Sequence, residues 1–145
     1  AFAETGVESR FVTFWLGVLD PAAHTLTVAN AGHMPTMLRH VDGTVEELGD
    51  EHTGVPLGVL DDSEYEQFTM QIKPGEAVCM YTDGLNEAMD ADGDLYSIER
   101  IRRQFGAPWR GVAEFGAALI HDVQQHMGAA PQGDDMCLVC FQRTK

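Results

Sequence analysis

The chain has 145 residues, of which 23 are Asp or Glu and 9 are Lys or Arg, so its formal net charge at pH 7 is -14. A surface this acidic repels nucleic-acid phosphates and anionic lipid headgroups and favours cations, so we expect no nucleic-acid partner and no membrane docking. The hydrophobic content is 44%, enough for one packed domain, and no apolar run approaches the roughly 20 residues of a membrane span.

The first part of the chain predicts strands. Phe11–Leu19 is apolar almost throughout and rich in β-branched and aromatic residues, which predicts a strand covered on both faces. His24–Asn30 alternates like a half-buried strand, and the strand Thr36–His40 leads into an Asp-Gly hairpin turn. Glu46–Glu66 holds eight acidic residues and no Lys or Arg, which predicts an exposed loop.

Two further strands, Tyr65–Ile72 and Glu76–Thr82, flank a Lys-Pro-Gly turn, and helices follow them. Ser97 is the expected N-cap of the first helix, which ends at Gly106. The apolar stripe of the second helix consists of Val112, Phe115, Leu119 and Val123, and Gly128 stops it.

Met136–Phe141 predicts a last buried strand, so the chain places strands first and helices mostly afterwards. This order favours an α+β layered domain over a parallel βαβ fold. The cysteines Cys79, Cys137 and Cys140 sit in apolar runs, which suits buried thiols in a reducing compartment and favours a cytoplasmic location.

Acidic residues adjoin two of these apolar strands. Asp83 directly follows the strand that ends at Thr82, and Asp134 and Asp135 directly precede the last strand. If the two strands are antiparallel neighbours, Asp83 and Asp134 meet at one edge of the sheet, where they repel unless a cation or proton lies between them. Carboxylates without His or Cys partners favour Mg²⁺ or Mn²⁺, although solvated turn residues are the alternative interpretation.

Five short motifs carry a resemblance that spans nearly the whole chain. They are Phe11-Val-Thr13, Ala29-Asn-Ala-Gly-His33, Gly54-Val-Pro-Leu-Gly58, Tyr81-Thr-Asp-Gly84 followed by Glu87, and Gly133-Asp-Asp-Met136. In order and spacing they resemble the bacterial SpoIIE-type branch of the metal-dependent phosphatase 2C (PPM) family. The resemblance implies an α-β-β-α sandwich, in which helices cover two antiparallel sheets, with a dinuclear Mg/Mn site at one end.

The resemblance also assigns roles to individual residues. Asp83 and Asp134 match two family ligands of one metal ion, and Asp135 matches a group just outside the direct ligands. His33 and Glu87 are further candidates around the site. For His33 the alternative is a loop histidine that holds a turn, and for Glu87 it is a surface or capping role.

The activity that the resemblance implies is hydrolysis of phosphoserine or phosphothreonine on a protein, by water activated by two metal ions. The implied substrate is a phosphorylated anti-sigma-factor antagonist or a similar regulator, and a sensor or receiver domain is expected upstream. The resemblance leaves open whether the protein forms a homodimer.

The resemblance has one large departure. Family members carry another metal-binding Asp and an Asp-Gly segment before the strand that here starts at Phe11, and Ala1–Arg10 contains neither. We therefore expect residues 1–145 to be the C-terminal two thirds of a single SpoIIE-type phosphatase domain, with little or no activity alone. The alternative is a non-catalytic interaction module that keeps the fold. Asp90–Asp94 resembles the start of a calcium loop but lacks its spacing, so we predict a turn there.

Overall fold

The structure is a computed structural model that describes residues 11–60 and 62–145. The chain divides into two compact units. The first unit comprises Ala1–Pro35 and Gly49–Lys73, and the second comprises Thr36–Leu48 and Pro74–Lys145. Each unit is built around its own four-stranded sheet. The predicted α+β class is confirmed, since strands and helices both occur and all but one of the strand pairings are antiparallel.

The sheet of the first unit is centred on one strand. Its members are β1 (Phe14–Asp20), β2 (Thr25–Ala31), β5 (Thr53–Gly54) and β6 (Gln67–Gln71). β2 pairs antiparallel with β1 along one edge, and along the other it pairs antiparallel with β6 and, at its last two residues, parallel with β5. Leu26 and Val28 of β2 are buried and alternate with half-buried residues, as predicted.

The prediction that the first strand is covered on both faces is wrong. Phe14, Leu16 and Val18 alternate along one face of β1 and are 48%, 50% and 58% exposed. Among the described residues β1 pairs only with β2, so it is an edge strand, and that face has no covering layer there. On the opposite face the Trp15 ring lies over Gly17, where it would overlap a Cβ atom. An apolar run shows that a strand is hydrophobic, but the run does not show what covers it.

The sheet of the second unit has the order β4-β3-β7-β8, with every pair antiparallel. Its strands are β3 (Thr36–Arg39), β4 (Val45–Leu48), β7 (Ala77–Tyr81) and β8 (Leu138–Gln142). The predicted Asp-Gly hairpin joins β3 to β4. The predicted acidic loop is therefore wrong at its start, because Glu46 and Glu47 belong to β4.

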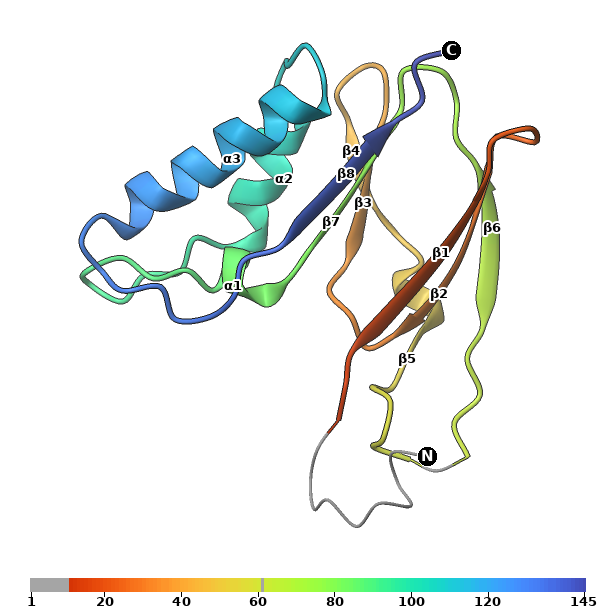
Figure 1. The fold of residues 1–145 in the computed structure, drawn as a ribbon, viewed down its shortest axis with the longest axis horizontal. Coiled ribbons are helices and arrows are strands. Elements are labelled where there is room, and N and C mark those ends of the chain that lie inside the picture. Colours follow the sequence, from red (N-terminus) through yellow and green to blue (C-terminus); the bar gives the residue numbers. More distant parts are fainter. Residues whose placement is uncertain (1–10, 61) are drawn as a thin grey trace. The chain divides into compact units, whose positions relative to one another are not determined.

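Three helices belong to the second unit: α1 (Asp83–Asn86), α2 (Ile98–Gly106) and α3 (Val112–Met127). Figure 1 shows α2 and α3 next to each other, and α2 contacts β3 and β4 while α3 contacts β8. Phe115, Leu119 and Val123 of the predicted apolar stripe are buried in α3, Val112 is half-buried, and α3 stops at Gly128 as expected. In α2 the buried residues are Ile101 and Phe105. Ser97 is the N-cap of α2 as predicted, but its φ is 78° and its side chain makes no cap hydrogen bond.

Burial in β8 is lower than predicted. The strand is half-buried, Val139 is 51% exposed, and Cys137, just before the strand, is exposed. Only Cys79 is fully buried among the three cysteines, because β7 lies inside the sheet whereas β8 is its edge. None of the helices in the described part of the chain is long and apolar enough to cross a membrane.

Candidate metal centre

The pairing on which the site prediction depends is present. β7 and β8 are antiparallel neighbours, with Tyr81 opposite Leu138, and the pairing continues one residue further because the Thr82 amide donates to the Cys137 carbonyl at 3.1 Å. Asp83 begins α1 directly after this pair, and Asp134 lies in the loop just before it. Both acidic segments therefore leave the sheet at the same end of the β7–β8 pair.

Gly84 brings the two segments into direct contact. A Cβ atom at this position would lie 2.5 Å from the Asp135 carbonyl oxygen and 3.2 Å from that of Asp134. Only a residue without a side chain allows the start of α1 to lie this close to the loop. The backbone of Gly84, next to Asp83, therefore contacts the backbone of Asp135, next to Asp134.

Thr82 adds a second connection between the same segments. Its hydroxyl donates to the Asp135 carbonyl at 2.9 Å and accepts a hydrogen bond from the Cys137 amide, also at 2.9 Å. Thr82 is part of the motif Tyr81-Thr-Asp-Gly84, but the motif assigned it no role of its own. The available signal was a hydroxyl at the junction between an apolar strand and an acidic residue.

The loop before β8 is also held by local hydrogen bonds. The Asp135 amide donates to Oδ1 of Asp134 at 2.6 Å, and the Gln132 side-chain amide donates to the Asp134 carbonyl at 2.7 Å. Asp134 is exposed, so its other carboxylate oxygen is accessible for a ligand. A carboxylate with one oxygen engaged by its own chain has a restricted orientation, which favours ligand binding at the other.

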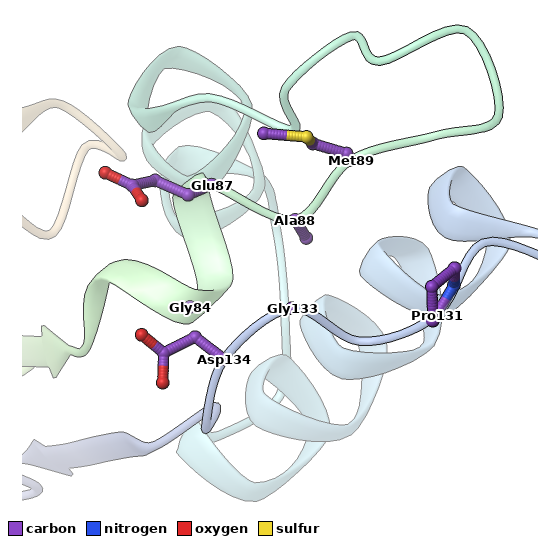
Figure 2. Close-up of a pocket in the computed structure, with 7 residues that line it drawn as sticks. All are labelled: Gly84, Glu87, Ala88, Met89, Pro131, Gly133 and Asp134. Carbon is purple, nitrogen blue, oxygen red and sulfur yellow. The ribbon is translucent and has the colours of Figure 1, made fainter.

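A pocket of about 260 Å³ adjoins this edge of the sheet. Figure 2 shows Gly84, Glu87, Ala88 and Met89 on one side of it, and Pro131, Gly133 and Asp134 on the other. In the figure the Asp134 side chain extends toward α1. Glu87 is exposed and follows α1 as its C-cap, with its amide bonded to the Asp83 carbonyl at 2.9 Å. The structure thus places Glu87 in the same pocket as Asp134.

The segment Asp90–Asp94 follows Met89, which lines the pocket, in the sequence. The Asp90 carboxylate accepts hydrogen bonds from the amides of Asp92 and Asp94, each at 2.9 Å, so the segment is the predicted turn. The hydrogen bond from Asp94 is the main cause that lowers the pKa of Asp90. Nε2 of His126, on α3, lies 2.9 Å from the Asp94 carbonyl and fixes the turn to the helix.

His33 belongs to the first unit, whereas the other candidate residues belong to the second. Its amide donates to the Asn30 side chain at 2.8 Å, the Asn30 amide group donates to the His33 carbonyl at 3.1 Å, and its ring Nδ1 lies 3.3 Å from the Met34 carbonyl. These contacts hold a turn. A role of His33 in the site stays a prediction.

The chemistry of the donors suits a hard divalent cation. Asp83 and Asp134 offer carboxylate oxygens, which Mg²⁺ and Mn²⁺ prefer, and neither His nor Cys adjoins them in the sequence. The number of donors is small: within the described ranges, no group of three or more His, Cys, Asp or Glu side chains could hold a metal ion. The residues therefore fit part of a metal coordination shell.

Comparisons with known proteins agree with the resemblance seen in the sequence. The model of the family described as Stage II sporulation protein E (SpoIIE) matches residues 1–144. The phosphoserine phosphatase RsbU of Bacillus subtilis is 31% identical over 88 residues, which cover 60% of this chain and 26% of RsbU. The chain spans about a quarter of the length of the curated relatives it matches.

Solved structures show the same fold. The RsbU and RsbW domains of a Mycobacterium tuberculosis protein match with a TM-score of 0.74 and 22% identity, over 98% of this chain and 39% of that one. The phosphatase domain of SpoIIE from Bacillus subtilis, presoaked with Mn, matches with a TM-score of 0.66 and 17% identity, over 98% of this chain and 69% of that one. At this identity the likeness establishes the fold, which is that of these phosphatase domains.

Proposed function

Because the chain belongs to the SpoIIE family, we propose that it forms part of a metal-dependent phosphatase that hydrolyses phosphoserine or phosphothreonine on a protein. The observation that carries the proposal is the contact of Gly84 with the loop before β8, which brings Asp83 and Asp134 to one sheet edge. The name of the relative RsbU, a phosphoserine phosphatase, supports the activity. Residues 1–145 would then be the C-terminal two thirds of one phosphatase domain.

Asp83 and Asp134 would hold one Mn²⁺ or Mg²⁺ ion of a two-ion site, and the Mn named for the related SpoIIE domain supports this choice. Such ions, when bound, lower the pKa of water and neutralise charge on the phosphoryl group. The residues of this chain supply the hard oxygen donors and hold them in place. Glu87 and Asp134 make the pocket acidic, so it repels a phosphoryl group until a cation is present.

For the substrate we infer a phosphorylated regulatory protein of the anti-sigma-factor-antagonist type. Support comes from the relatives, since RsbU-like and RsbW-like domains share one chain in the Mycobacterium tuberculosis protein. An upstream sensor or receiver domain would control the phosphatase. The acidic composition, with a net charge of -14, supports a protein rather than a nucleic acid as the partner.

The proposal is tested with the product of the complete gene, Mn²⁺ and serine-phosphorylated casein as the probe substrate. We expect Asp83→Asn and Asp134→Asn each to lower the rate of phosphate release by more than the roughly 10–100-fold typical of losing an outer partner of a metal ligand. Asp62→Asn, which removes an exposed carboxylate in the first unit, is the matched control and should leave the rate unchanged. Unchanged turnover in both site variants would refute the metal-site assignment.

A second candidate is a non-catalytic interaction module with the phosphatase fold. The observation that favours it is the small donor set, because no group of three or more candidate ligands occurs in the part of the chain that the structure describes. The same assay separates the two candidates. Mn²⁺-dependent phosphate release by the complete gene product supports the enzyme, and its absence, with binding of phosphorylated casein retained, supports the module.

A further inference from the structure

Thr82 connects the two acidic segments of the candidate metal centre through three hydrogen bonds. Its backbone amide donates to the Cys137 carbonyl at 3.1 Å. Its hydroxyl donates to the Asp135 carbonyl and accepts from the Cys137 amide, both at 2.9 Å. The hydroxyl thus uses its single proton and one lone pair on backbone groups of the same loop, two residues apart.

The hydrogen bonds of Thr82 lie next to both candidate ligands in the sequence. Asp83 is the next residue after Thr82, and Asp134 directly precedes Asp135, whose carbonyl Thr82 binds. Gly84 packs against the same loop on the other side of Asp83. The backbone of each carboxylate is therefore fixed relative to the other by contacts within one or two residues.

We propose that Thr82 is a positioning residue of the metal centre, whose hydroxyl sets the separation of the Asp83 and Asp134 carboxylates. The inference rests on the proposed function, because it takes these two carboxylates as ligands of one ion. Two like charges held close together repel each other, so the loop before β8 needs a restraint that does not depend on the metal. A hydroxyl that bonds both a carbonyl and an amide of that loop is such a restraint.

Valine and serine separate the effect of the hydroxyl from that of the shape. Thr82→Val keeps the size and branching of the side chain and leaves the Asp135 carbonyl and the Cys137 amide without this partner, whereas Thr82→Ser keeps the hydroxyl. Thr36→Val is the matched control. Thr36 is a buried threonine of the same unit, in β3, and its hydroxyl has no hydrogen-bond partner among the described residues.

The first measurement is the Mn²⁺ affinity of the complete gene product, from the electron paramagnetic resonance signal of free Mn²⁺. We expect Thr82→Val to weaken binding by about 10–100-fold, the usual effect of losing a group that orients a metal ligand. Thr82→Ser and Thr36→Val should bind like the wild type. Wild-type affinity in Thr82→Val, or an equal loss in Thr82→Ser, would overturn the proposal.

The second measurement is hydrogen exchange of the Cys137 amide by nuclear magnetic resonance, without metal. Exchange should accelerate in Thr82→Val and stay unchanged in Thr82→Ser and Thr36→Val, and equal exchange in all four proteins would show that the connection is absent. If exchange changes as expected but the wild-type complete gene product binds Mn²⁺ no better than its Asp83→Asn variant, the proposed metal site has failed and the positioning role is withdrawn with it. If the wild type binds and Thr82→Val binds equally, only the positioning role has failed.

Discussion

Gly84 illustrates how a single residue determines whether the two acidic segments can meet. Its Cα lies against the backbone of the loop before β8, so any side chain would enter the space of the Asp135 carbonyl, 2.5 Å away. We expect Gly84→Ala to push the loop away, to lower the free energy of unfolding by about 1–3 kcal/mol, as overpacking does, and to weaken Mn²⁺ binding. Urea unfolding and Mn²⁺ titration of the complete gene product measure the two effects.

Gly116 provides the matched control for this substitution. It lies inside α3, where an added Cβ would meet only Cδ2 of Leu138 at 3.5 Å, an ordinary contact. Because alanine favours a helix interior, Gly116→Ala should raise the free energy of unfolding by about 0.5–1 kcal/mol and leave Mn²⁺ affinity unchanged. Equal effects of the two substitutions would contradict the close approach at Gly84.

At the scale of residues, the sequence predicts which carboxylates adjoin the sheet but not what fixes them. Asp83 and Asp134 could be found because each adjoins an apolar strand. The contacts of Thr82 and Gly84 depend on the register between β7 and the loop before β8, and no local pattern encodes that register. The sequence therefore identifies the candidate metal-binding carboxylates, whereas the contacts that hold them in place are seen only in the structure.

Among the elements, β3 and β7 are joined at their ends by a hydrogen-bonded pair, His40 and Glu76. Nδ1 of His40 lies 2.8 Å from the buried carboxylate of Glu76, and its Nε2 lies 3.3 Å from Glu46 on β4. The hydrogen bond with Glu76 is the main cause that raises the pKa of His40 above its ordinary value of 6.5. A raised pKa means that the folded state holds the proton more tightly than the unfolded state does.

The pair should therefore make stability depend on pH with a defined sign. Its contribution is complete below about pH 6.5, the unfolded value, and is lost as the pH rises through the higher folded value. We expect the difference in free energy of unfolding between wild type and His40→Gln to shrink as the pH increases through this window, measured by urea unfolding. His121→Gln, at an exposed position of α3, is the control, and a difference that grows with pH would contradict the assignment.

The strands show which features of an element a sequence can predict. Alternation in β2 predicted half-burial correctly, because the side-chain period of a strand is local. The continuous apolar run of β1 predicted a covered strand wrongly, because cover comes from a neighbouring layer that the run does not encode. The same reason explains β8, which the sequence predicts to be buried and which lies half-buried at the edge of its sheet.

For the whole molecule, the dominant feature is the net charge of -14 on 145 residues. Few of these charges belong to the candidate metal centre, and many of the others are exposed, including Glu51, Asp62, Glu64 and Glu66. Like charges that folding concentrates into a small volume repel one another, which lowers the stability of the compact state. Ions in solution screen this repulsion over the Debye length, which falls from about 30 Å at 0.01 M to about 8 Å at 0.15 M ionic strength.

We therefore expect the melting temperature of the chain to rise between these two ionic strengths, as measured by scanning calorimetry in NaCl at pH 7. Sodium chloride is preferable to sulfate, since sulfate also strengthens apolar burial through its exclusion from the protein surface. A control with sucrose at equal osmolality separates charge screening from the stabilisation that any solute excluded from the protein surface provides. Salt bridges such as Arg102–Glu47 weaken on screening, so a melting temperature that falls with NaCl would mean that specific pairs outweigh the general repulsion. In that case the acidic excess would be compensated within the fold, and cations would not be needed to neutralise it.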